Sequence, residues 1–305
     1  MYLDHFGMRE LPFRLTPDTS FFFNHASHQE ALNVLQVALR SGEGFIKITG
    51  EVGTGKTMLC RMLLNSLDDT YITAYIPNPY LSPAALYLAV ADELEISYPQ
   101  KTSYNRLLGL INDHSIRLSE QGKSVVICMD EVQSMPEKTL EALRLLSNLE
   151  TEKSKLLQVI MFGQPELDTL LARPTIRQLR QRIGFSYKLQ PLTRQTLFGY
   201  VQYRLRVADF PGEGLFHERA ITELHKSSRG IPRLVNMLSH KALMAAYGKG
   251  QQQVTRQHIR MAANDTEDAA PTRAARSPLV FKLATMGTVV LFAGAGAAYF
   301  MGLMP

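Results

Sequence analysis

GEVGTGKT, at residues 50–57, fits the phosphate-loop pattern G-x-x-x-x-G-K-[ST] at every fixed position. Glycines have no Cβ, so the backbone of such a loop can turn through positive φ and direct its N–H groups at phosphate oxygens. Lys56 would bring its charge to the β- and γ-phosphates, and the Thr57 hydroxyl would be a ligand of Mg²⁺. The motif predicts a nucleoside-triphosphate site formed by Gly50, Glu51, Val52, Gly53, Thr54, Gly55, Lys56, Thr57 and Met58.

The flanks of this motif have the periodicity that a phosphate loop requires. Residues 45–49 have the pattern of a short buried strand, and residues 58–64 that of a helix whose N-terminus would face the triphosphate. Further strand patterns alternate with helical patterns, at residues 71–76, 124–129, 156–162 and 185–189. This alternation predicts an α/β fold, in which a parallel sheet has helices on both faces.

Two adjacent carboxylates, Asp130 and Glu131, end the apolar strand pattern at residues 124–129. Asp130 would reach the coordination shell of Mg²⁺, and Glu131 would polarise the water that attacks the γ-phosphate. We expect strand 71–76 to lie between the loop strand and this strand, as in oligomeric motor ATPases and unlike small-molecule kinases. Loop and acids together predict a site for triphosphate hydrolysis.

Polar and basic side chains follow the later strand patterns. The amide of Gln164 would bind a water beside the γ-phosphate, although an ordinary turn glutamine has the same sequence pattern. Arg233, in the motif GIPR at residues 230–233, begins a helix and would close over the phosphates. An arginine from a neighbouring subunit can stabilise the charge of the transition state. The sequence offers four candidates for that role, Arg173, Arg177, Arg180 and Arg182.

The strand patterns end near residue 192, and helical patterns continue to about residue 263. We therefore expect an ATPase domain at 1–192, an all-helical lid domain at 193–263, a linker at 264–278 and a transmembrane helix at 279–304. No residue from 283 to 304 is charged, and about 20 apolar residues are enough to cross a bilayer. Basic residues precede this segment, so the positive-inside rule predicts a cytoplasmic ATPase domain. The alternative for residues 279–304 is an apolar helix that docks on a partner protein instead of crossing a membrane.

Composition and charge place weaker bounds on function. The chain has 305 residues, of which 45% are hydrophobic, and this is enough for two folded units. Its formal net charge is +5, with 33 basic and 28 acidic residues and no long basic run, so charge alone indicates no nucleic-acid partner. The two cysteines, Cys60 and Cys128, lie in apolar patterns and are expected to be buried, reduced thiols.

The motifs GEVGTGKT, VVICMDE, FGQPEL, RQLRQRI and RGIPR occur in this order, and FGMRELPF stands at residues 6–13. Over residues 1 to about 263 the sequence resembles the AAA+ ATPases of the ExeA or GspA type from general secretion pathways. The resemblance implies ATP as the nucleotide and a ring-like homo-oligomer such as a hexamer. It also implies Gln164 as the first sensor, Arg233 as the second, and Arg182 as the arginine that enters a neighbour's site.

A chain that stops after one membrane helix resembles, within this family, the ATPase of MSHA-type pilus biogenesis, because ExeA-like members continue into a periplasmic peptidoglycan-binding domain. The leading hypothesis is a bacterial inner-membrane ATPase that supports assembly of a type IV pilus or type II secretion apparatus, with assembly proteins as partners. One alternative is a DNA-associated AAA+ ATPase of the transposition or replication-initiation type. The membrane segment, and the lack of room for a winged-helix domain after residue 263, argue against that alternative. A second alternative is a nucleotide-gated scaffold that binds ATP and hydrolyses it very slowly.

Overall fold

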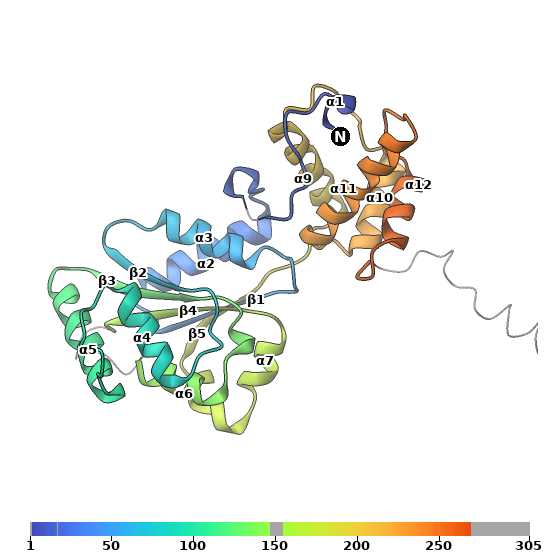
Figure 1. The fold of residues 1–305 in the computed structure, drawn as a ribbon. Helices are drawn as coiled ribbons and strands as arrows, with labels where there is room; N and C mark the ends of the chain where they lie inside the picture. The colour runs from blue at the N-terminus through green and yellow to red at the C-terminus, as the bar shows by residue number, and fades with distance from the viewer. Residues whose placement is uncertain (1, 17, 147–154, 270–305) are drawn as a thin grey trace, which may run out of the picture.

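A parallel five-stranded sheet with the strand order β2-β3-β4-β1-β5 forms the centre of the N-terminal part of the molecule (Figure 1). The computed structural model describes residues 2–16, 18–146 and 155–269. The strands are β1 (Phe45–Thr49), β2 (Tyr71–Ile76), β3 (Ser124–Met129), β4 (Leu157–Gly163) and β5 (Ile183–Lys188). The predicted α/β fold with a parallel sheet is confirmed.

The position of β2 differs from the expectation. This strand lies at the edge of the sheet beside β3, and β4 stands between β3 and β1. Burial explains the order, because every residue of β4 is buried and only two residues of β2 are. The strand that is apolar on both faces takes the central position, and the less apolar strand takes the edge. One strand still separates β1, which precedes the phosphate loop, from β3, which precedes the two carboxylates, but that strand is β4 and not β2.

Helices cover both faces of the sheet, since alternate residues of each strand point to opposite sides. One core contains Val125, Ile127 and Met129 of β3 with one group of helices, α4 (Pro83–Glu93), α5 (Tyr104–Glu120), α6 (Glu137–Leu146), α7 (Glu166–Leu171) and α8 (Arg177–Arg180). The other contains Val126 and Cys128 with α2 (Ala26–Arg40) and α3 (Lys56–Ser66). Cys128 and Cys60 are buried and free, as predicted.

A second group of helices follows β5 in the chain and packs around a core of its own. We call this group the helical cluster; it comprises α9 (Arg194–Val207), α10 (Glu218–Ser228), α11 (Pro232–Gly248) and α12 (Arg256–Asn264). The N-terminal segment joins the same core through α1 (Leu3–Phe6) and through Tyr2, Met8 and Phe13. Figure 1 shows α1 lying against this cluster, away from the sheet. This long-range packing was not predicted from the sequence.

The expected localisation, a single-pass protein of the bacterial inner membrane with a cytoplasmic ATPase domain, is contradicted. Among the residues that the structure describes, no helix has the length and apolar character needed to cross a membrane. The longest of them, α5 and α11, have 17 residues each, and a membrane span needs about 20 predominantly apolar residues. The segment predicted to be transmembrane, 279–304, lies outside the described residues.

Candidate nucleotide site

The loop between β1 and α3 contains two glycines in the left-handed region, Gly53 with φ 81° and Gly55 with φ 98°. Close approach restricts the loop further. A Cβ on Gly53 would lie 2.4 Å from the Cβ of Arg233, and one on Gly50 would lie 2.7 Å from the hydroxyl oxygen of Thr54. The loop therefore requires glycines where the motif has them, and it lies directly against the start of α11.

Lys56 begins α3 and is almost completely buried. Its Nζ donates to two carbonyl oxygens of the loop, that of Gly50 at 2.8 Å and that of Glu51 at 3.1 Å. Burial lowers the pKa of the Lys56 ammonium, and the nearby carboxylates of Glu131 and Asp130 oppose that shift. Neutral carbonyls are weaker partners for an ammonium than an anion is. The side chain is thus placed to transfer its hydrogen bonds to a phosphate.

Thr57 and Asp130 link the loop to the end of β3. The Thr57 hydroxyl donates to Asp130 Oδ2 at 2.5 Å, and the other carboxylate oxygen accepts from the backbone N–H of Glu131 at 2.9 Å. Burial raises the pKa of the Asp130 carboxyl, and these hydrogen bonds oppose that rise. Magnesium prefers oxygen ligands and takes only one or two from the protein when it also binds phosphates. A hydroxyl beside a buried carboxylate fits this requirement.

Glu131 has a left-handed backbone conformation, with φ 53°. Its Oε2 accepts from Gln164 Nε2 at 2.9 Å and from Gln133 Nε2 at 2.6 Å. The structure therefore brings together Glu131 and Gln164, which the sequence analysis selected, and adds Gln133, which it missed. The available signal was the position of Gln133, two residues after the carboxylate at the same strand end.

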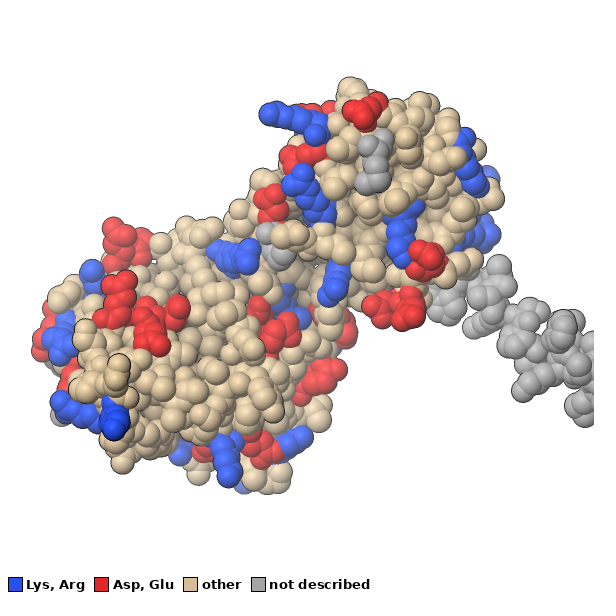
Figure 2. All heavy atoms as spheres, in the orientation of Figure 1, with Lys and Arg blue, Asp and Glu red and all other residues tan. Residues whose placement is uncertain are grey.

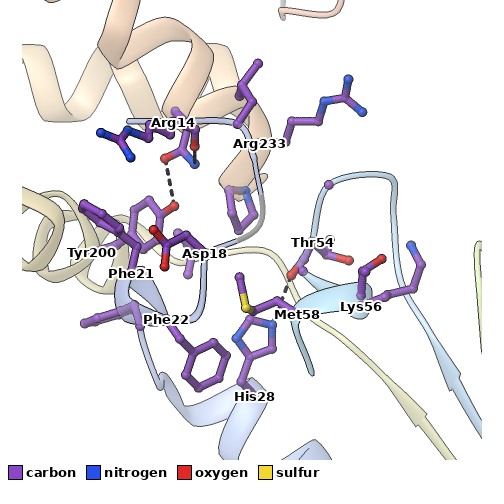
Figure 3. A pocket seen from close by; sticks show the side chains of 18 of the residues that line it. Arg14, Asp18, Phe21, Phe22, His28, Thr54, Lys56, Met58, Tyr200 and Arg233 are labelled. Atoms are coloured by element: carbon purple, nitrogen blue, oxygen red, sulfur yellow. Dashed lines mark hydrogen bonds between the residues drawn. The ribbon is translucent and has the colours of Figure 1, made fainter. Parts of the chain in front are cut away.

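A cavity of about 430 Å³ lies between the loop, the N-terminal segment and the helical cluster. Its volume falls in the range typical of ligand pockets. Figure 3 shows Lys56, Thr54 and Met58 on one side of this cavity, Arg233 and Arg14 above it, and aromatic side chains opposite the loop. Residues 52–58 line it, together with Glu131, whereas Gly50 and Glu51 at the start of the phosphate loop do not.

Aromatic side chains also line the cavity, and the sequence analysis did not identify them. Its walls include Phe22, Tyr200 and His28. The rings of Phe22 and His28 stack with centroids 5.5 Å apart, and His28 Nε2 lies 3.1 Å from the carbonyl oxygen of Thr54. Burial lowers the pKa of His28. Flat ring faces of this kind suit a planar aromatic group.

The four candidate arginines lie outside this cavity. Arg173, Arg177 and Arg180 are exposed, and Arg173 forms an ion pair with Glu137. Arg182 is half-buried immediately before β5 and does not line the cavity. An arginine that acts in a neighbouring subunit need not line the cavity of its own subunit. The assignment of Arg182 to that role thus stays a prediction.

Comparisons with known proteins show which sequences and folds this chain is similar to. Residues 39–171 match the model of the AAA domain family. The chain is 39% identical over 305 residues to General secretion pathway protein A of Aeromonas hydrophila, and this match covers all of the chain and 55% of the relative. The chain thus spans about half the length of the curated relative that it matches.

Solved structures with the same fold include Cdc6p from Pyrobaculum aerophilum, with a TM-score of 0.62, 20% identity, and coverage of 81% of this chain and 70% of that one. The Aeropyrum pernix ORC2 protein has a TM-score of 0.60 and 16% identity, with 84% and 73% covered. The Thermotoga maritima RuvB branch migration motor has a TM-score of 0.54 and 17% identity, with 83% and 73% covered. At these identities the similarity indicates the fold alone.

Proposed function

The chain belongs to the family of AAA+ ATPases that includes General secretion pathway protein A, and from this we propose that it hydrolyses ATP to support assembly of a secretion apparatus or a type IV pilus. One observation carries the hydrolytic part of the proposal. The Thr57 hydroxyl lines the cavity together with Lys56 and Glu131, and it lies within hydrogen-bonding distance of the Asp130 carboxylate. Phosphate ligands, magnesium ligands and a base are thus close together.

Each side chain has a defined part in the proposed reaction. The loop N–H groups and Lys56 bind the phosphates of ATP, and Thr57 and Asp130 would hold Mg²⁺, which when bound neutralises phosphate charge. Glu131 accepts the proton of the attacking water, and Gln164 helps to orient that water. Arg233, which belongs to the helical cluster, contacts the phosphates of ATP. We propose that the helical cluster acts as a lid.

The cellular part of the proposal comes from the relative. Its printed name associates it with the general secretion pathway. We propose that this chain acts in type II secretion or in MSHA-type pilus assembly, as a homo-oligomeric ring in which Arg182 reaches the neighbouring subunit's site. On the face shown in Figure 2, basic and acidic side chains are interspersed, and this surface differs from the basic stripe of a nucleic-acid-binding protein.

Two substitutions test the hydrolytic proposal. Lys56→Ala removes the buried ammonium and should abolish ATP binding in titration calorimetry. Glu131→Gln should keep ATP binding and stop phosphate release. Lys101→Ala, a change at an exposed lysine, is the matched control and should behave as wild type. Equal ATP affinity in wild type and Lys56→Ala would refute the assignment of the loop.

Complementation tests the cellular role. A strain that lacks this gene should recover surface pili or protein secretion with the wild-type gene and with Lys101→Ala, and with neither Lys56→Ala nor Glu131→Gln. Recovery with all four genes would show that nucleotide turnover is not needed for the process. Salt-dependent binding of the purified protein to duplex DNA would instead support the DNA-associated alternative.

A further inference from the structure

Gln133 connects the carboxyl ends of two strands. It lies in the short 3-10 helix η2 (Val132–Ser134), directly after β3 and the two acids. Its amide Nε2 donates to Glu131 Oε2 at 2.6 Å, and its Oε1 accepts from the backbone N–H of Gln164 at 2.9 Å. The same side chain thus holds the Glu131 carboxylate and the first residue after β4.

Within the described part of the chain, both side-chain donors to the Glu131 carboxylate bind the same oxygen. Oε2 accepts both amide donors, from Gln133 and from Gln164. The backbone is fixed as well, because the N–H and the hydroxyl of Ser134 both donate to the Glu131 carbonyl oxygen, at 2.9 and 2.8 Å. With two donors on Oε2 and an anchored main chain, the carboxylate has one preferred orientation, in which Oε1 remains to accept a proton.

The end of β4 is shaped to receive this amide. A Cβ on Gly163 would lie 3.2 Å from Gln133 Oε1 and 2.7 Å from the side chain of Leu167. Any larger residue at position 163 would push the amide away from β4. The contact between Gln133 and Gln164 therefore depends on the glycine that precedes Gln164.

We propose that Gln133 is a positioning residue for ATP hydrolysis, one that presents Glu131 Oε1 to the attacking water by holding Oε2. The inference rests on the proposed function. A general base must lie within hydrogen-bond reach of the proton that it takes, and a displacement of about 1 Å costs up to about 100-fold in rate. Through its second contact, Gln133 also keeps Glu131 and Gln164 in register at the ends of β3 and β4.

Two variants separate the two contacts of Gln133. Gln133→Glu keeps an acceptor for the Gln164 N–H and replaces the donor to Glu131 by a second carboxylate. Gln133→Met has a similar length and loses both contacts. In both variants we expect kcat for phosphate release to fall about 10- to 100-fold, while KM and the ATP dissociation constant change by less than about twofold.

Gln158 is the matched control. It is a buried glutamine of β4 whose amide donates to the carbonyl oxygens of Leu39 and Glu43, each at 3.1 Å. Gln158→Met should lower the melting temperature and leave kcat per folded molecule unchanged. This control separates a loss of amide hydrogen bonds in general from the loss of the one that holds Glu131.

Two outcomes would overturn the inference. One is an unchanged or increased kcat in Gln133→Glu, whether or not kcat falls in Gln133→Met, and the other is a fall in kcat accompanied by an equal loss of ATP affinity. Failure of the proposed function itself would look different. In that case wild type and Glu131→Gln would release phosphate at the same rate, whatever residue stands at position 133.

Discussion

The backbone N–H of Arg233 donates a hydrogen bond to the carbonyl oxygen of Gly53, with 3.2 Å between nitrogen and oxygen. The first turn of α11 thus touches the phosphate loop directly. Arg233 is part of this turn, so the distance between the phosphate loop and α11 also determines the position of the Arg233 guanidinium. A change in the loop on nucleotide binding would reach the helical cluster through this contact.

Gly53→Ala should disrupt this contact. The new Cβ would clash with Arg233 and would also place a non-glycine residue at φ 81°, which costs about 1–3 kcal/mol. We expect ATP affinity to fall by more than about tenfold, measured by titration calorimetry. Gly122→Ala is the matched control, since Gly122 has φ 74° and open space around it. It should lower the melting temperature without changing ATP affinity. Equal effects of both substitutions on affinity would show that the clash is irrelevant.

Arg233→Ala tests the side chain separately from the backbone. A hydrogen bond to a charged group contributes about 1.5–3 kcal/mol, so the loss of the guanidinium should weaken ATP binding by about 10- to 100-fold. The measurement is the dissociation constant of a fluorescent ATP analogue. Arg219→Ala, at an exposed arginine of α10, should bind as wild type does. An unchanged dissociation constant in Arg233→Ala would exclude a contact with bound phosphate.

Stability should fall between about pH 6.5 and pH 4 because of His25. Burial, and then the charge of His28, lower the pKa of His25 from 6.5 to about 4. His25 binds its proton more tightly in the unfolded chain than in the folded one. The stability that the neutral imidazole allows is therefore fully present above pH 6.5 and is lost as the pH falls toward 4. Since His25 is partly exposed, we expect the free energy of unfolding to fall by about 1 kcal/mol over this pH range. Urea unfolding at pH 7 and pH 5 should show a smaller pH effect in His25→Gln than in wild type or the exposed-site variant His217→Gln. The same pH effect in all three would contradict the prediction.

Arg204 fixes the N-terminal segment to α9. This buried arginine donates to the carbonyl oxygen of Pro12 and to the Tyr200 hydroxyl at 3.0 Å, and its guanidinium lies 4.6 Å from the ring centre of Phe21. Arg204→Met leaves buried acceptors without donors, which costs about 1–3 kcal/mol. Hydrogen exchange should accelerate in residues 10–21 in particular. The exposed Arg206→Met should not have this effect, and uniform acceleration along the chain would argue against a local anchor.

Local features of the sequence predicted the fold well. The bounds of β1, β2 and β3 agree with the predicted strands at both ends, because alternation and apolar runs determine each strand without reference to the rest of the chain. The motifs selected Lys56, Thr57, Asp130 and Glu131, and the structure brings these side chains close together, while their roles toward a triphosphate stay predictions.

Long-range packing could not be predicted in this way. The edge position of β2 depends on how much each strand buries against the helices, a property of the assembled sheet. Gln133 meets Gln164 across 31 residues, and Arg204 meets Pro12 across 192. The aromatic wall of the cavity is likewise formed by segments far apart in the chain. The roles of Gln164, Arg182 and Arg233 stay predictions, since they depend on bound nucleotide or on a second subunit.

The burial of Tyr2, Phe6 and Phe13 in the core of the helical cluster has a consequence for biosynthesis. Their partners in α9 to α12 leave the ribosome about 200 residues later. At a synthesis rate of roughly 5–20 residues per second, these aromatic side chains remain unburied for on the order of 10 to 40 seconds before their packing partners are synthesised. During that interval they are a natural substrate for chaperones, and a fusion tag or truncation at this end should impair maturation of the helical cluster more than that of the sheet.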